Sequence, residues 1–330
     1  MINKILETLY SKVFINIIVG DSKTTVYAQV HSKNKVLDSN TEEFKTISTS
    51  PKMLTFINSY TSQSPYHYIS ILDKSLNQGA VPSCKEIKKF IKDADLKTIC
   101  ISNEWSLYTH EEDIKTLRYE YKEIGLDFIF SPFKILTSFF KDKIDSTLAI
   151  FLLVQDVSMS LCIFDNSKML YAQYLDMSTF EEEEDLIMDS ILDEDDDDIL
   201  EMQDVNLDDL DADMDSLEDF ADIEDLDSGL DIDEFSEAQE IEDIVEDKAL
   251  DIENINDDYK RFIAIQDSIS RFYKDDKYES EFLEHIYIAD SADVSNDLKK
   301  YLKEEMFLNV VIRRIGLEEE LCDMAKAELK

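Results

Sequence analysis

One block of acidic residues constrains the fold of this chain more than any other feature. Between Glu181 and Asp258 the sequence holds 38 acidic residues and one basic residue, Lys248. Like charges at this density repel one another within the roughly 8 Å screening length of physiological salt, which opposes collapse into a core. The net charge of the whole chain is −42, so the remainder is close to neutral. We therefore predict that residues 179–256 form a disordered acidic insertion.

Apolar residues recur inside this block at steps of three or four, a spacing that would align them on one face of a helix. They are Leu207, Leu210, Met214, Leu217, Phe220, Ile223 and Leu226. The block is therefore either a solvated linker or a segment that folds onto a basic or apolar partner. A calcium loop of the EF-hand type is rejected because the run Asp225 to Gly229 misplaces the glycine and lacks a third oxygen ligand.

The flanking regions show alternating and apolar runs typical of strands, separated by turn residues and helical patterns. In the first region we predict strands at 14–20, 24–31, within 35–47, 66–72, 97–102 and 126–130, and helices at 51–60 (capped by Ser50), 85–93, 111–123 and 131–141. In the second we predict strands at 148–154, 158–164, 169–175, 286–289 and 309–312, and helices at 259–273, 296–305 and 318–329. The stretch 77–82 is expected to be irregular.

Both regions thus begin with three consecutive strands and continue with alternating helices and strands. This order is that of an α/β, ribonuclease-H-like unit, and its duplication is the actin/Hsp70-like architecture. We predict a first actin-like lobe at 1–145, a second at 146–178 plus 257–330, and the acidic insertion, 179–256, within the second lobe. A loop position tolerates such an insertion because loop-closure entropy grows slowly with length.

Several classes of protein are excluded by composition. No run approaches the roughly 18 apolar residues that span a bilayer, and the first residues lack the pattern of a secretory signal. The folded parts are near neutral, which argues against nucleic-acid binding. Cys84, Cys100, Cys162 and Cys322 are widely spaced, so we expect reduced thiols in a cytoplasmic protein. The four histidines are equally scattered, and no metal site is predicted.

Recognisable catalytic motifs are missing from the sequence. A phosphate cradle needs close backbone approach, which glycine permits, but the chain has five glycines and no GxxxxGKS/T, GxGxxG, GxSxG or HExxH pattern. We therefore expect a protein that is not an enzyme and needs no cofactor.

The order of elements resembles that of PilM, the actin-like assembly protein of type IV pili, over about Val13 to Leu175 and Tyr259 to Ile315. In that family two phosphate loops and an adenosine loop carry DxG, DIG and GGxA patterns. The corresponding positions here lie at 17–23, 154–164 and 286–293, and most of the glycines are replaced. The resemblance implies a degenerate nucleotide cleft formed by Gly20, Asp21, Ser22, Lys23, Asp156, Ser158, Asp290 and Ser291.

The resemblance also implies a function. A PilM-like protein would be a non-catalytic scaffold that binds the cytosolic amino-terminal segment of an inner-membrane, PilN-like partner, and would reach the membrane only through that partner. The machine would be a type IV pilus, type II secretion, DNA-uptake or motor accessory structure; self-association stays open. One alternative is an active actin-like ATPase in which Asp21 and Asp156 hold Mg²⁺. Another is an acidic chaperone or nucleic-acid mimic, which follows from charge alone.

Overall fold

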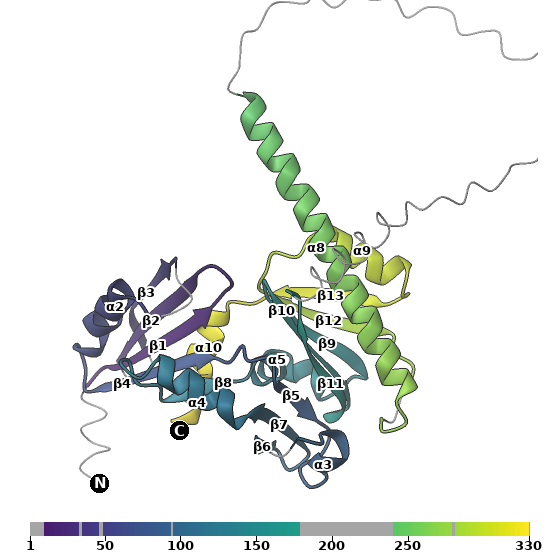
Figure 1. Cartoon of the computed structure of the whole chain (residues 1–330), viewed down its shortest axis with the longest axis horizontal. Coiled ribbons are helices and arrows are strands. Elements are labelled where there is room, and N and C mark those ends of the chain that lie inside the picture. Colours follow the sequence, from purple (N-terminus) through teal and green to yellow (C-terminus); the bar gives the residue numbers. More distant parts are fainter. Residues whose placement is uncertain are drawn as a thin grey trace, which may run out of the picture. The chain divides into compact units, whose positions relative to one another are not determined.

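The structure is a computed structural model that describes residues 10–32, 35–45, 49–93, 95–178, 240–278 and 281–329 (Figure 1). Side chains of the long helix α8 (Glu240–Lys274) are described from residue 257 on. The predicted apolar face at 207–226 lies outside the described residues. The chain divides into two compact units, Met1–Glu182 with Ile252–Lys330, and Glu183–Asp251. Both predicted lobes therefore belong to the first unit, and the boundaries predicted between them stay predictions.

The first sheet has five strands in the order β3-β2-β1-β4-β8 (Figure 1). β1 (Lys12–Val19), β2 (Thr24–Ser32) and β3 (Lys35–Phe44) form the expected antiparallel meander. β4 (Tyr66–Leu72) pairs in parallel with β1, and β8 (Phe128–Phe130) pairs in parallel with β4. The apolar side chains of β1 and β2 are buried, which explains the continuous apolar runs in their sequences.

The second sheet repeats this arrangement in the order β11-β10-β9-β12-β13. β9 (Ala149–Val154), β10 (Ser158–Asp165) and β11 (Lys168–Asp176) are antiparallel, and β12 (His285–Asp290) and β13 (Asn309–Arg314) continue the sheet in parallel. Strand order and direction are the same in both sheets. This confirms the duplicated ribonuclease-H-like prediction and the actin/Hsp70-like fold.

A third sheet was not predicted. It is antiparallel, with the order β5-β7-β6, and consists of β5 (Gln78–Val81), β7 (Trp105–His110) and β6 (Leu96–Ile101). The prediction of an irregular stretch at 77–82 was wrong because β5, although only four residues long, is buried and paired. The helix predicted at 85–93 shortens to α3 (Ile87–Phe90).

The helices that cover the sheets mostly follow prediction. In α2 (Pro51–Thr61), the hydroxyl of Ser50 accepts a hydrogen bond from the backbone N–H of Met53 at 3.3 Å, as expected of an N-cap. The remaining helices of the first region are α4 (Glu111–Glu120), α5 (Pro132–Phe139) and α6 (Lys141–Ile144). Among the described helices, none has the length and apolar character needed to cross a bilayer.

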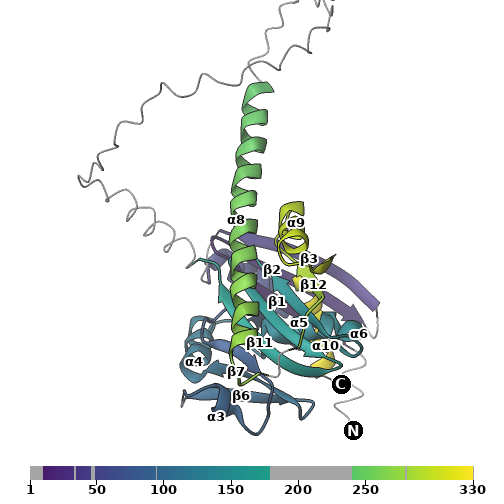
Figure 2. The ribbon, with the colours of Figure 1, turned by 90° about the vertical axis from the view of Figure 1, so that its right-hand side faces the viewer.

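Helix α8 (Glu240–Lys274) begins well before the predicted residue 259. Residues 240–256, which we had placed in the disordered insertion, are therefore helical. The carboxyl-terminal part of α8 packs on the second sheet through buried Phe262, Ile265, Ile269 and Phe272. α9 (Asn296–Glu304) contributes Leu298 and Leu302 to the same core, and Figure 2 shows both helices.

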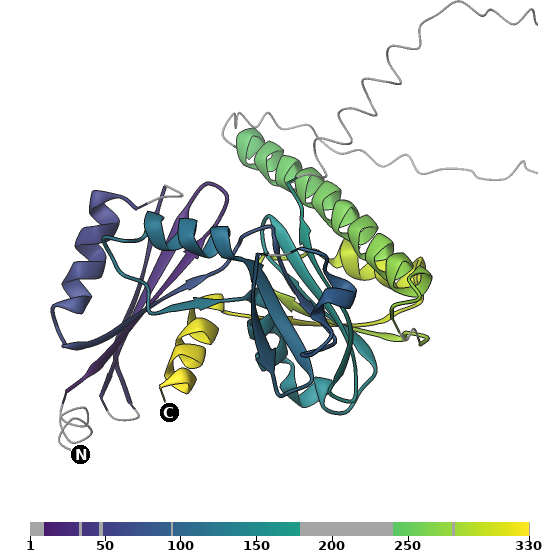
Figure 3. The same ribbon diagram turned by 60° about the horizontal axis from the view of Figure 1, so that its bottom comes forward.

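Helix α10 (Leu317–Glu328), the last of the chain, packs on the first sheet (Figure 3). Leu321, Cys322 and Met324 of α10 share a core with Phe14 and Tyr27 of that sheet. The chain thus returns from the second sheet to the first at its carboxyl end.

The cysteine prediction needs a correction. Cys84, after β5, and Cys100, on β6, form a disulfide with a Cα–Cα separation of 5.4 Å. The third sheet brings the two residues together, and their separation of 16 positions in the sequence carries no pairing motif. Cys162 and Cys322 are free and buried, as expected.

Candidate functional site

Two cavities of the first unit are candidate sites. The first, which we call the interlobe cleft, has a volume of about 320 Å³ and lies between the hairpin turn 20–23 and the hairpin turn 155–157. Its walls include five of the predicted nucleotide residues: Gly20, Lys23, Asp156, Ser158 and Ser291. The structure therefore brings together residues from three distant segments, as the duplicated fold requires.

One backbone N–H at the start of each turn is hydrogen-bonded within its hairpin. The Gly20 N–H donates to the carbonyl of Lys23 at 2.8 Å, and the Gln155 N–H donates to the carbonyl of Ser158 at 2.9 Å. These N–H groups are not free to bind a phosphate, which is the task such turns perform in a nucleotide cradle.

The charges of the interlobe cleft also disfavour a polyphosphate. Its lysines are Lys23, which forms an ion pair with Glu43 at 2.7 Å, and Lys74, whose pKa is lowered by burial. The hydrogen bond to Glu43 raises the pKa of Lys23. Four carboxylates line the cleft: Glu43, Asp156, Asp293 and Glu318, of which Asp293 forms an ion pair with Arg314. The carboxylates outnumber these three cations, which disfavours the binding of an anion.

Asp290 lies outside the interlobe cleft, although the resemblance assigned it to the degenerate nucleotide cleft. Its buried carboxylate accepts hydrogen bonds from the N–H groups of Ala292 at 3.0 Å and Val294 at 3.2 Å. It stabilises its own turn and does not line the cleft. The hydroxyl of Ser291 donates to the carbonyl of Val154 at 2.7 Å. Ser22 is exposed on the first turn, also outside the cleft.

The Mg²⁺ pair proposed for an ATPase, Asp21 and Asp156, lines an adjoining cavity of about 290 Å³ together with Lys260 and Arg261. Arg261 is held by a buried ion pair with Asp258 at 2.7 Å. No cluster of three or more metal-ligating side chains occurs in the part of the chain that the structure describes. Two carboxylates beside two cations do not resemble the all-oxygen surroundings that Mg²⁺ prefers.

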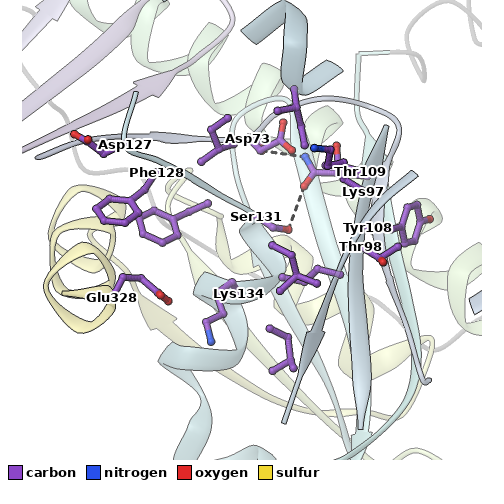
Figure 4. Close-up of a pocket in the computed structure, with 17 residues that line it drawn as sticks. Asp73, Lys97, Thr98, Tyr108, Thr109, Asp127, Phe128, Ser131, Lys134 and Glu328 are labelled. Carbon is purple, nitrogen blue, oxygen red and sulfur yellow. Dashed lines mark hydrogen bonds between the residues drawn. The ribbon is translucent and has the colours of Figure 1, made fainter. Parts of the chain in front are cut away.

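The second cavity, which we call the first-lobe groove, has a volume of about 410 Å³ (Figure 4). It lies between the first sheet and the third, and most of its surface is apolar. The apolar lining residues are Ile99 and Ile101 of β6, Leu107 of β7, Ile114 of α4, and Phe128, Ile129 and Phe130 of β8. Sequence reasoning missed this groove because the third sheet was not predicted.

Two walls of the groove are edge strands. Within the described residues, β6 pairs with β7 alone, and β8 pairs with β4 alone. β6 is also open to solvent: the side chain of Ile99 is 63% exposed. An edge strand that is open to solvent leaves backbone N–H and C=O groups available to pair with an added strand.

One end of the groove is polar. The amide of Gln78 donates to the carbonyl groups of Asp73 and Ser75, each at 3.0 Å, and the hydroxyl of Ser131 donates to the amide oxygen of Gln78 at 3.2 Å (Figure 4). The carboxylate of Asp73 lies beside this network and is buried. A few placed polar groups at the end of an apolar cavity are typical of a binding site.

Comparisons with known proteins identify families and similar folds. Residues 150–330 match the family described as domain of unknown function DUF8341, and residues 10–137 match that described as domain of unknown function DUF8569. No curated protein matches the chain.

Among solved structures, a Bacteroides thetaiotaomicron protein with actin-like ATPase fold and unknown function is similar over 92% of this chain and 91% of its own, with 11% identity and a TM-score of 0.47. The ethanolamine utilization protein EutJ from Carboxydothermus hydrogenoformans is similar over 91% and 84%, with 6% identity and a TM-score of 0.38. Component A of the Acidaminococcus fermentans (R)-2-hydroxyglutaryl-CoA dehydratase is similar over 94% of both chains, with 8% identity and a TM-score of 0.38.

Proposed function

Because this chain belongs to the DUF8341 family, a family of unknown function, we propose its function from the geometry of its cavities: it is a non-catalytic scaffold that binds an extended peptide in the first-lobe groove. The observation that carries this proposal is the position of two edge strands, β6 and β8, on the walls of one apolar cavity.

An edge strand offers unpaired backbone N–H and C=O groups to an added strand. A peptide that pairs with such an edge gains affinity from main-chain hydrogen bonds, and it gains specificity from pockets that receive alternate side chains. The groove supplies both, because Ile99 and Phe128 line it from the two edge strands. An apolar peptide would also cover Ile99, which is otherwise exposed.

The partner that fits this proposal is the cytosolic amino-terminal segment of an inner-membrane, PilN-like protein. The protein would then be cytoplasmic and would reach the membrane through that partner, similar to PilM in a type IV pilus, type II secretion, DNA-uptake or motor accessory structure. The interlobe cleft supports a scaffold over an enzyme, because the Gly20 and Gln155 N–H groups are engaged within their hairpins and carboxylates outnumber cations in the cleft.

The test is a selection of short random peptides with free amino termini, displayed on phage, against the whole protein. Affinities of the selected peptides are then measured by fluorescence anisotropy for two variants. Ile99→Arg places a charge in the groove, whereas Val36→Arg places the same charge on another exposed apolar residue of an edge strand, β3. Ile99→Arg should weaken binding about tenfold or more, and Val36→Arg should not. Peptides that bind both variants like the parent would overturn the proposal.

An actin-like ATPase is the second candidate, favoured by the convergence of Gly20, Lys23 and Asp156 in one cleft. Calorimetry with Mg²⁺ and ATP separates the two. The scaffold should show no saturable binding below about millimolar, roughly 4 kcal/mol weaker than a micromolar site. A low-micromolar constant that Asp156→Ala abolishes would instead establish the ATPase.

A further inference from the structure

The first-lobe groove contains a buried carboxylate with no counter-ion. Asp73 follows β4 at the polar end of the groove, and its side chain is 6% exposed. Its Oδ1 accepts hydrogen bonds from the N–H of Ser75 at 3.0 Å and from the hydroxyl of Ser75 at 2.7 Å. In the described part of the chain, no Lys, Arg or His forms an ion pair with it.

Such a group is costly to bury. A carboxylate taken out of water needs a cation or several hydrogen bonds to offset its lost solvation. Burial raises the pKa of Asp73; hydrogen bonds from Ser75 and Thr109 lower it, and the nearby charge of Asp113 raises it again. The neutral donors offset the desolvation incompletely, and Asp73 lines the groove.

We propose that Asp73 binds a cationic group of the peptide in the first-lobe groove. The inference rests on the proposed function and names the chemistry of the peptide: an amino-terminal ammonium, or the side chain of a lysine or arginine. A cation donates hydrogen bonds and accepts none, so it needs acceptors around it. The hydroxyl oxygens of Thr109 and Ser131 line the groove together with Asp73.

Asp73 is buried, whereas the other charged residues that line the groove are partly or fully exposed: Lys97, Asp127, Lys134 and Glu328. In Figure 4 the side chain of Lys134 lies well away from Asp73. A cation of the peptide is attracted most strongly to the buried, desolvated charge of Asp73. Placement of that cation at Asp73 also puts the apolar remainder of the peptide against Ile101 and Phe128.

The test uses peptides selected on the parent protein and two matched variants. Asp73→Asn removes the charge but keeps an oxygen that accepts the hydrogen bonds of Ser75, so the turn is preserved. Asp176→Asn is the control, because Asp176 lies outside the groove and its Oδ1 accepts the same pair of hydrogen bonds, from the N–H of Ser178 at 3.1 Å and from the hydroxyl of Ser178 at 2.7 Å. We expect Asp73→Asn to weaken binding about tenfold or more. Asp176→Asn should change it about threefold or less, since its charge does not face the groove.

Modified peptides identify the source of the cation. Loss of affinity on amino-terminal acetylation assigns the ammonium, and loss on replacement of lysine or arginine by glutamine assigns the side chain. In Asp73→Asn the responsible modification should have no further effect. If neither modification weakens binding, the inference is overturned.

The inference and the proposed function fail in different ways. If Ile99→Arg weakens binding but Asp73→Asn does not, the groove binds peptides and the role of Asp73 is wrong. If Ile99→Arg has no effect, the groove is not the binding site and both proposals fall. If Asp73→Asn misfolds, the affinity of the parent protein for the peptide is measured over a series of pH values instead. The affinity should fall as the pH is lowered and Asp73 becomes protonated, and this fall should occur at a higher pH than for an ordinary aspartate.

Discussion

Asn16, on the central strand of the first sheet, donates a hydrogen bond of 3.0 Å to the backbone carbonyl of Glu318, at the start of the last helix. Its own side-chain oxygen accepts a hydrogen bond from the buried hydroxyl of Ser70 at 2.5 Å. One side chain therefore joins two neighbouring strands to a helix that follows it by 302 residues.

We predict that Asn16→Ala lowers the free energy of unfolding by about 1–3 kcal/mol, because it leaves the Ser70 hydroxyl and the Glu318 carbonyl without this partner. Asn58→Ala, on the exposed face of α2, is the control and should change stability by less than about 0.5 kcal/mol. Urea denaturation measures both. Equal effects would show that the last helix does not depend on this contact.

The disulfide between Cys84 and Cys100 should stabilise the third sheet and with it one wall of the groove. In the chain-entropy description a loop of this length contributes about 3 kcal/mol. The double variant Cys84→Ser/Cys100→Ser should therefore be about 3 kcal/mol less stable than the oxidised parent. Peptide binding in the groove should also be weaker in the double variant.

Thiol counting provides the check. Denatured but unreduced protein should show two reactive thiols, those of Cys162 and Cys322. Four reactive thiols in oxidised protein would contradict the disulfide. Cys162→Ser is not a suitable control for the loss of the disulfide, because Cys162 is buried in the core and its substitution would itself change the stability.

Asp73 should make stability depend on pH in a direction opposite to that of a salt-bridged aspartate. The pKa of Asp73 is raised in the folded protein. Its favourable contribution to the free energy of unfolding is therefore complete when the pH is below 3.8, the ordinary pKa of an aspartate, and is lost as the pH rises through the higher pKa of the folded state. At neutral pH the buried charge, which faces Asp113 and Tyr174, destabilises the fold.

Asp73→Asn should therefore raise the melting temperature at neutral pH and lose this advantage below about pH 3.8, which thermal melts across the pH range would show. A gain in stability together with a loss of peptide binding is expected of a binding residue that is costly to the fold. A lower melting temperature at neutral pH would instead indicate that Asp73 serves the turn.

The acidic insertion should be replaceable by a short linker. Met177 and Asp257 line the same cavity, so the chain leaves and re-enters the second lobe at neighbouring points. A protein with Met177 joined to Asn256 through a short Gly/Ser linker should stay monodisperse and melt within a few degrees of the parent, because shortening a loop changes its closure entropy only slightly.

Phe272→Asp should behave in the opposite way. Phe272 is fully buried against the second sheet, and a carboxylate there has no partner, which costs several kcal/mol. Size-exclusion chromatography and melting curves compare the two proteins. Aggregation of the shortened protein alongside normal folding of Phe272→Asp would show that α8 is not part of this core.

The sequence by itself determined the repeated fold. The strands of both sheets and the cap at Ser50 depend on neighbouring residues: apolar alternation, turn chemistry and side-chain to backbone hydrogen bonds over a few positions. The three-strand meanders followed by parallel strands could be predicted for this reason, and with them the convergence of Gly20, Lys23 and Asp156.

Tertiary structure alone decided the candidate binding site. The third sheet pairs the short strand β5 with β7, which lies more than twenty residues away, and no local pattern of 78–81 indicates that pairing. The disulfide, the groove and the burial of Asp73 all depend on that sheet, and the place of α10 depends on Asn16 at the other end of the chain. These features come from contacts between distant segments, whose free energy is set by packing and desolvation in three dimensions and leaves no periodic signal in the sequence.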